Sequence, residues 1–333
     1  MKIKLIGLVL TLSVGTIFTP TAQAANLQGS GSSFASNFIE KCKIAYASTG
    51  NTINYTPNGS GSGKNQFSMG VTDFAISDTP YGSSETKPSR NFVYVPIVAG
   101  PIAISYKLDG YTGTLKLTKD NLAKIFAGKI TTWNDPLLKK DNPGKLPGKK
   151  ITVIYRADGS GTSEIFTTYL NTVANDIWNN PGNKAFSTTY PGNINERLGS
   201  FISASGSQGV QLLQSKTDAS IAYNEVSYTN NFKVAYIENG AGRFMKPTVN
   251  GASRFLSDFV VNPNGTITPN YNNPNKMAYN ISTFSYGIAP IGSKDIAKFF
   301  TFAITKCKAA ELGYSPISGD ALKLAKSQIS KIG

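Results

Sequence analysis

The sequence predicts an α/β protein whose sheets are mainly parallel. Short runs rich in β-branched and aromatic residues alternate with helical stretches, which is typical of strand–helix–strand units. Three loops rich in glycine and serine lead into expected helices, and two of them directly follow a strand-like run. The chain has 333 residues, 40% of them hydrophobic and 16% charged, which is sufficient for one large or two ordinary globular domains.

The expected elements alternate along the chain. We expect strands at 51–55 (NTINY), 73–76 (DFAI), 92–97 (FVYVPI), 102–106 (IAISY) and 151–155 (ITVIY). We expect helices at 36–46, 118–127, 163–173 and 295–306. The second of these helices has the clearest boundaries, because Thr118 can cap it, Asp120 suits its first turn and Gly128 can end it.

The first 24 residues have the pattern of a secretory signal peptide. Lys2 and Lys4 provide a positive start, residues 5–12 form an apolar run, and Ala22-Gln23-Ala24 offers a small–x–small cleavage site. The apolar run is too short to span a membrane comfortably. We therefore expect cleavage near Ala24 and a soluble protein outside the cytoplasm.

Cys42 and Cys307 are the two cysteines of the chain. In an oxidising compartment they most simply form one disulfide, and two buried free thiols are the alternative. A bridge over so long a loop contributes up to roughly 5 kcal/mol of stability in the chain-entropy model. It would also place the first helix of the exported chain and its last segments in one structural unit.

The composition excludes several kinds of site. Without histidine the chain has no Ser-His-Asp or Cys-His pair and no histidine-ligated metal, and two cysteines cannot form a four-thiolate zinc site. The formal charge of +14 can attract nucleic acid, an anionic surface or an anionic ligand. Because the lysines are scattered, a well-solvated basic surface is the simpler explanation. We expect no metal, no cofactor and no nucleic-acid partner.

The three loops rich in glycine and serine carry the best candidate binding groups. They are GSGSSF at 29–34, GSGSG at 59–63 and RADGSGTS at 156–163. Glycine allows tight turns, serine and threonine add hydroxyl donors, and the free amides at a helix start suit a tetrahedral oxyanion. One such loop commonly does no more than cap a helix, whereas three in one chain favour an anion site.

Two charged residues indicate which anion would be bound. Arg156 offers a fork of donors that matches phosphate, and Asp158 is placed to orient it, although a surface Arg–Asp pair is the alternative. Asp78 ends a strand-like run, where α/β proteins bind ligands. A carboxylate there accepts a proton from phosphate but repels sulfate, which has none to donate. A turn or helix-cap aspartate is the alternative for Asp78.

These motifs resemble the periplasmic phosphate-binding proteins of phosphate ABC transporters. The resemblance rests on GSGSSF, GSGSG, DFAISD, KIFAGKITTWNDP (124–136) and RADGSGTS, and extends in order from about Gly29 to Tyr223. It implies the two-lobed periplasmic-binding-protein fold, with the ligand in the hinge cleft. Lobe one would combine 25–104 with 280–333, and lobe two would be 105–279. Both cysteines would then belong to lobe one.

The resemblance also implies a set of phosphate ligands: Ser33, Phe34, Ser60, Asp78, Arg156, Ser160, Gly161 and Thr162. Ser33 and Phe34 would offer backbone amides, Asp78 would accept the ligand proton, and Asp158 would orient Arg156. The sequence departs from the family pattern at two points. The first loop has serine where threonine is common, and the second reads GSGSG instead of GSSGG, which leaves Ser60 and Ser62 as alternatives.

The function implied by the resemblance is that of a receptor and not of an enzyme. It would capture inorganic phosphate in the periplasm, as a monomer, and deliver it to the permease and ATPase complex of a phosphate ABC transporter. The alternatives are a secreted phosphatase-like enzyme and a basic surface or adhesive protein. We expect Trp133 and Trp178 to pack in the core, and the turn at 203–209 to line the cleft without touching the anion.

Overall fold

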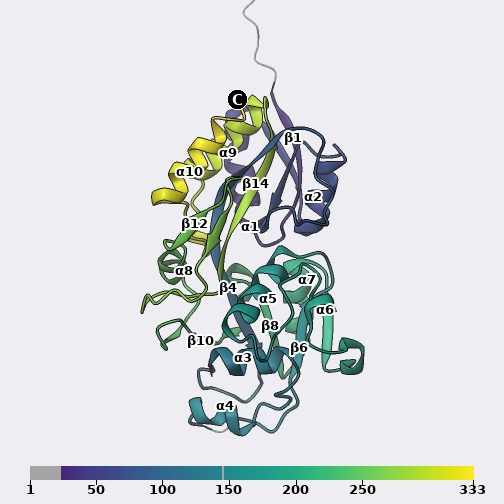
Figure 1. The fold of residues 1–333 in the computed structure, drawn as a ribbon, viewed down its shortest axis with the longest axis vertical. Helices are drawn as coiled ribbons and strands as arrows, with labels where there is room; N and C mark the ends of the chain where they lie inside the picture. Colours follow the sequence, from purple (N-terminus) through teal and green to yellow (C-terminus); the bar gives the residue numbers. More distant parts are fainter. Residues whose placement is uncertain (1–23, 145) are drawn as a thin grey trace, which may run out of the picture.

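A nine-stranded mixed sheet runs through both halves of the computed structural model, which describes residues 24–144 and 146–333 (Figure 1). Its strand order is β2-β1-β3-β14-β4-β8-β6-β7, and β9 pairs with β4 beside this path. The strands are β1 (Asn26–Gly31), β2 (Thr52–Thr56), β3 (Phe74–Ser77), β4 (Phe92–Lys107), β6 (Thr152–Arg156), β7 (Phe201–Ala204), β8 (Ser220–Glu225), β9 (Lys233–Val234) and β14 (Ser282–Pro290).

We call the part of the molecule with β1, β2, β3 and β14 the first half, and the part with β6, β7 and β8 the second half. Strand β4 belongs to both halves. Its residues up to Pro101 pair with β14, and its residues from Ile102 onward pair with β8. The sequence predicted two strands here, at 92–97 and 102–106, because Gly100 and Pro101 are unfavourable inside a strand. The structure instead has one buried strand that changes partners at this point, so β4 connects the two halves directly (Figure 1).

The parallel pairs lie within each half. β1 pairs in parallel with β2 and β3, and β6 pairs in parallel with β7 and β8. β4 and β14 run antiparallel to each other, and they also run antiparallel to β8 and β3 respectively. These two strands are the exceptions to the expected parallel sheets, and both lie in the middle of the strand order.

The helices cover the faces of the sheet. They are α1 (Ser36–Tyr46), α2 (Ser60–Ser68), α3 (Lys119–Phe126), α4 (Pro136–Asp141), α5 (Gly161–Val173), α6 (Phe186–Thr189), α7 (Gly206–Ser215), α8 (Val249–Phe255), α9 (Lys294–Lys306) and α10 (Gly319–Ile329). Thr118 caps α3 as expected, since its hydroxyl oxygen accepts the N–H of Asn121 at 3.1 Å. The four expected helices agree with α1, α3, α5 and α9 to within two residues at each end.

Five shorter strands lie outside the large sheet. β10 (Tyr236–Glu238) pairs with β11 (Phe244–Met245) and β5 (Lys116–Leu117), and β12 (Phe259–Val261) pairs with β13 (Ile267–Pro269). Helix α8 and the β12–β13 pair contact the first half of the sheet: Ser253 bonds to Ser315, and the N–H of Ile267 donates to the hydroxyl of Tyr286. The boundaries of the lobes remain a prediction.

The disulfide between Cys42 and Cys307 is present, which confirms the expectation from the compartment. It joins α1 to the residue that follows α9, so it connects two segments of the first half. Trp133 and Trp178 are fully buried, and the indole N–H of Trp133 donates to the carbonyl of Ala219 at 3.0 Å. Both tryptophans are packing residues, as predicted.

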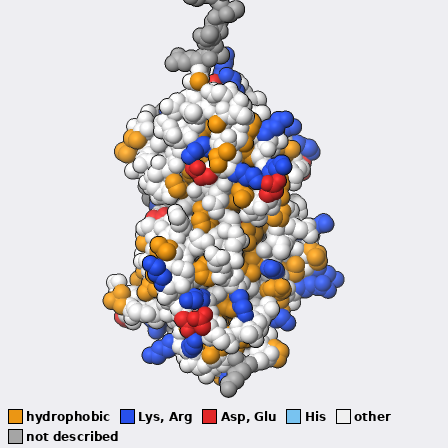
Figure 2. Space-filling model, turned by 180° about the vertical axis from the view of Figure 1, so that it is seen from behind, with side chains coloured by type: hydrophobic (Ala, Val, Ile, Leu, Met, Phe, Trp, Pro, Cys, Tyr) orange, Lys and Arg blue, Asp and Glu red, His pale blue; other side chains and the backbone are white. Residues whose placement is uncertain are grey.

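Lysine and arginine side chains are dispersed over the face shown in Figure 2 and do not form one basic patch there. Among residues 24–144 and 146–333, no helix is long and apolar enough to cross a membrane. The same residues contain no group of three acidic or thiol side chains suited to a metal ion. The expected signal peptide, 1–24, lies outside the described residues except for Ala24.

Candidate anion-binding site

The three loops rich in glycine and serine meet between the two halves. The N–H of Gly61 donates to the carbonyl of Gly159 at 2.8 Å, and the N–H of Gly59 donates to the carbonyl of Gly31 at 2.8 Å. The loop that begins α2 therefore bridges the loop after β1 and the loop after β6. The three candidate loops are thus neighbours in the fold.

The start of α5 lies directly against the first half because residue 161 is a glycine. A Cβ atom on Gly161 would lie 2.6 Å from the hydroxyl oxygen of Ser60 and 2.9 Å from Oδ2 of Asp78. A larger residue at this position would displace the side chains of Ser60 and Asp78. The free amides of the first turn of α5 thus lie beside the side chains of Ser60 and Asp78.

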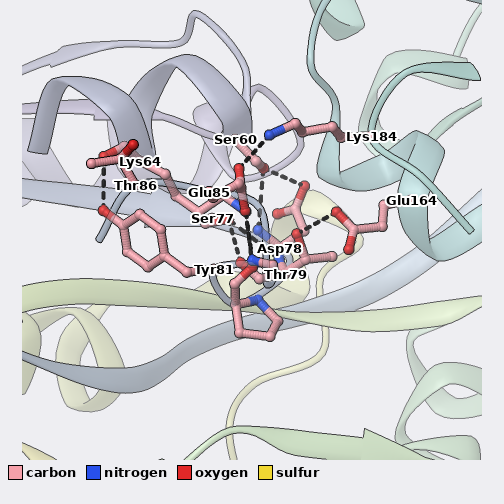
Figure 3. A network of polar contacts seen from close by, with 12 residues as sticks. Ser60, Lys64, Ser77, Asp78, Thr79, Tyr81, Glu85, Thr86, Glu164 and Lys184 are labelled. Atoms are coloured by element: carbon pink, nitrogen blue, oxygen red, sulfur yellow. Dashed lines mark hydrogen bonds and ion pairs between the residues drawn. The ribbon is translucent and has the colours of Figure 1, made fainter. Parts of the chain in front are cut away.

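Asp78 follows β3 and is buried, with 3% of its surface exposed. Its Oδ1 accepts the hydroxyls of Ser32 and Ser285, each at 2.6 Å. Its Oδ2 accepts the hydroxyl of Ser60 at 3.3 Å (Figure 3). Burial raises the pKa of Asp78 above its ordinary value, although the three hydroxyls and the nearby Arg156 oppose this shift. Asp78 is therefore a buried acceptor surrounded by neutral donors.

Arg156 ends β6 and is also buried, with 3% of its surface exposed. Its Nε and Nη2 donate to the two carboxylate oxygens of Asp158 at 2.7 and 2.5 Å, and the N–H of Gly206 donates to the same carboxylate at 2.9 Å. Burial alone would raise the pKa of Asp158, but Arg156 and Gly206 together lower it below its ordinary value. The predicted Arg156–Asp158 pair is thus present and bidentate.

Ser33, Ser160 and Thr162 lie near the contact between the two halves. The hydroxyl of Ser33 bonds to that of Ser207 at 3.1 Å and accepts the Ser207 N–H at 3.0 Å. The hydroxyl oxygen of Ser160 caps α5 by accepting the N–H of Ser163 at 3.1 Å. Thr162 is buried, and its hydroxyl has no hydrogen-bond partner among the described residues. Phe34 is fully buried in the core.

Three serines of the site were not predicted. Ser32 adjoins the predicted Ser33 in the first loop, so its position in the sequence could have indicated that it belongs to the site. Ser207 belongs to the turn at 203–209, which was expected to line the cleft, and its contact with Ser33 places it there. Ser285 lies in a fully buried strand, 207 residues from Asp78, and nothing in the local sequence indicates its contact.

Polar contacts between the halves surround the site. Glu85 forms ion pairs with the buried Lys64 of its own half and with Lys184 of the other half (Figure 3). The hydroxyl of Thr79 donates to Glu164 of α5 at 2.8 Å, as Figure 3 also shows. These contacts join the two halves beside the buried Asp78.

Comparison with known proteins decides the family. Residues 18–306 match the sequence model of the PBP superfamily domain. The phosphate-binding protein PstS of Haemophilus influenzae is 34% identical over 331 residues, which cover 95% of this chain and 96% of that protein. The chain belongs to the phosphate-binding protein family. Within this family, the PstS protein of Methanocaldococcus jannaschii is 29% identical and covers 99% of this chain and 96% of its own length.

Solved structures of phosphate-binding proteins have the same fold. A periplasmic phosphate-binding protein named PfluDING, bound with phosphate, has a TM-score of 0.71 at 21% identity, over 92% of each chain. The phosphate-binding protein of Stenotrophomonas maltophilia has a TM-score of 0.64 at 19% identity, over 93% of this chain and 92% of that one. These likenesses concern the fold alone, and they confirm the two-lobed α/β class.

Proposed function

We propose that the protein binds inorganic phosphate outside the cytoplasm and delivers it to the permease and ATPase complex of a phosphate ABC transporter. The observation that carries this proposal is that one buried acceptor, Asp78, lies within electrostatic range of one buried bidentate donor, Arg156, where the two halves meet. Serine hydroxyls fix Oδ1 of Asp78, and Asp158 binds Nε and Nη2 of Arg156. We propose that Oδ2 of Asp78 and Nη1 of Arg156 bind the same phosphate between the halves. The names of the relatives agree with this function.

The proposed ligands come from both halves, so that binding favours the closed form. Arg156 neutralises the anion, and the amides at the start of α5 with the hydroxyl of Thr162 donate to its oxygens. Asp78 accepts the proton that phosphate retains. The complete proposed set from the first half is Ser33, Phe34, Ser60 and Asp78, and that from the second half is Arg156, Ser160, Gly161 and Thr162.

We infer that the protein acts as a receptor in the periplasm and not as an enzyme. The relatives bear the names of phosphate-binding proteins, and the chain has no histidine to serve as a catalytic base at neutral pH. Turnover of a chromogenic phosphate ester by highly purified protein, lost in Arg156→Ala, would contradict this inference. The apolar N-terminal segment supports export.

Calorimetric titration of the exported protein with phosphate and then with sulfate tests the function. We expect one phosphate per chain and an affinity for sulfate at least roughly 100-fold weaker, because sulfate leaves the buried Asp78 carboxylate repelled and unpaired. Equal affinities would contradict the role of Asp78 in selectivity. Absence of phosphate binding by a folded, phosphate-stripped protein would overturn the function itself.

A further inference from the structure

Ser285 is a buried hydroxyl that the proposed phosphate ligands do not include. In the antiparallel pairing of β14 with β3, Tyr286 lies opposite Ser77, so Ser285 is the residue that faces Asp78 one step beyond. The register of β14 against β4 shifts between Ser285 and Tyr286, and such irregularities re-aim side chains. The result is the hydrogen bond of 2.6 Å from the Ser285 hydroxyl to Oδ1 of Asp78.

Ser32 reaches the same oxygen from the other neighbouring strand. β1 flanks β3 on the side away from β14, and Ser32 follows the last residue of β1. Its hydroxyl oxygen accepts the N–H of Ala35 at 3.2 Å, while its hydrogen goes to Oδ1 of Asp78 at 2.6 Å. The order β1-β3-β14 therefore surrounds Asp78 with one serine from each side.

Two donors on Oδ1 leave Oδ2 as the oxygen that can meet a ligand. Within the described part of the chain, Oδ2 accepts only the longer bond of 3.3 Å from Ser60, and it faces Gly161 at the start of α5. A proton on Oδ1 would require both serine hydroxyls to turn away from it. Hydrogen bonds donated to a carboxylate favour its ionised form, which opposes the effect of burial on Asp78.

We propose that Ser285 and Ser32 determine specificity as positioning residues, by holding Asp78 ionised with Oδ2 toward the anion so that fully ionised anions are rejected. This inference rests on the proposed phosphate-binding function. The other titratable groups around Asp78 are Arg156 from β6 and the phenol of Tyr55 from β2. Glu164 of α5 bonds to the adjacent Thr79.

Ser32 and Ser285 belong to the same half of the molecule as Asp78, whereas Arg156 belongs to the other half. Arg156 also favours the ionised carboxylate, but it belongs to the second half and acts on Asp78 only while the cleft is closed. Ser285 lies on β14, and Ser32 and Asp78 directly follow the neighbouring strands β1 and β3, all in the first half. Their hydrogen bonds therefore persist in the open form, so the carboxylate is ready before any anion arrives.

Calorimetry with sulfate across a range of about pH 4.5 to 8 tests this proposal in Ser285→Ala. Sulfate binds once Asp78 is protonated, so it gains affinity as the pH falls through the pKa of that carboxyl. Losing one donor raises this pKa, and we expect the sulfate profile to move upward by about one pH unit. Phosphate, which can donate a proton itself, should bind at pH 7.5 within about threefold of the wild-type affinity.

The matched control is Ser30→Ala, since Ser30 is a buried serine of β1 whose hydroxyl has no partner among the described residues. This variant should retain the wild-type sulfate profile. Ser32→Ala should move the pH profile of sulfate affinity in the same direction as Ser285→Ala. If Ser285→Ala does not fold, Ser32→Ala alone tests whether the serine donors control the pKa of Asp78.

A direct titration separates this inference from the function on which it rests. The carboxyl pKa of Asp78 is measured by carbon-13 NMR in the ligand-free protein, with the signal assigned by its loss in Asp78→Asn. A higher pKa in both serine variants supports the inference. Unchanged pKa values, or a sulfate gain that is the same at every pH, overturn it while phosphate binding stands. Absence of phosphate binding by the wild-type protein overturns the function instead.

Discussion

Asp78 and Asp158 are two carboxylates on opposite sides of one cleft, and their surroundings differ in kind. Asp78 receives hydrogen bonds from three neutral serine hydroxyls, and its pKa is raised because burial outweighs them. Asp158 receives two bonds from the Arg156 guanidinium, and its pKa is lowered despite burial. A bonded cation lowers the pKa of one carboxyl despite burial, whereas the neutral donors around the other only partly offset the effect of burial.

This difference assigns separate tasks to the two halves. The second half contributes the Arg156 guanidinium, whose bidentate pairing with Asp158 fixes the direction of its remaining donors toward an anion. The first half contributes discrimination, because only Asp78 can respond to whether the guest carries a proton. Variants of the second half should therefore change affinity, and variants of the first half should change selectivity.

Arg156→Met should have the largest effect on phosphate binding. It removes the buried guanidinium and leaves Asp158 as an uncompensated buried carboxylate, which repels the anion. We expect phosphate affinity to fall by roughly 100- to 1,000-fold in calorimetry. Arg254→Met, at an exposed arginine of α8, is the control and should bind as the wild type does. A loss smaller than about threefold in Arg156→Met would contradict the assignment of charge to the second half.

Asp78→Asn should change selectivity more than affinity. The serine hydroxyls can still donate to the amide oxygen at the Oδ1 position, so the amide nitrogen would occupy the Oδ2 position and offer a donor to the anion. We expect the ratio of phosphate to sulfate affinity to fall by roughly 30-fold or more. Asp73→Asn, an exposed residue just before β3, is the control. An unchanged ratio of phosphate to sulfate affinity in Asp78→Asn would contradict the assignment of selectivity to the first half.

The sequence was sufficient for the second half of the site and insufficient for the first. Arg156, Asp158 and the start of α5 lie within one motif, so their contacts follow from local spacing. Asp78 was found because it ends a strand, but its donors come from two neighbouring strands whose order the sequence does not show. Ser285 in particular depends on an antiparallel pairing and a register shift, which no local pattern encodes.

Glu225 is a third buried carboxyl and can be compared with Asp78 and Asp158. It accepts the N–H of Ser227, and burial is the main cause that raises its pKa to about 8. Between its ordinary pKa and 8, the folded protein holds a proton that the unfolded chain has released. The free energy of unfolding should therefore fall with rising pH in this window, by up to about 1.4 kcal/mol per pH unit.

Urea unfolding at several pH values measures this dependence, and Glu225→Gln should flatten it because the amide does not titrate. Glu196→Gln, at an exposed carboxyl, should keep the slope of the wild type. Identical slopes in Glu225→Gln and the wild type would show that burial does not hold this carboxyl neutral.

The contact between the halves at Lys184 should have the smallest effect, because the ion pair with Glu85 lies at the rim of the cleft and Lys184 is 37% exposed. Exposed pairs contribute about 0 to 1 kcal/mol. Since Lys184 and Glu85 belong to different halves, Lys184→Met should weaken the closed form and accelerate phosphate release by about two- to fivefold in stopped-flow measurements. Lys149→Met is the control: it removes a comparably exposed lysine from its ion pair with Asp218, at 2.6 Å, within the second half. Equal release rates in the two variants would show that the pair at Lys184 does not contribute to closure. The hydrogen bond between Thr79 and Glu164 of α5 would then be the contact beside Asp78 to test next.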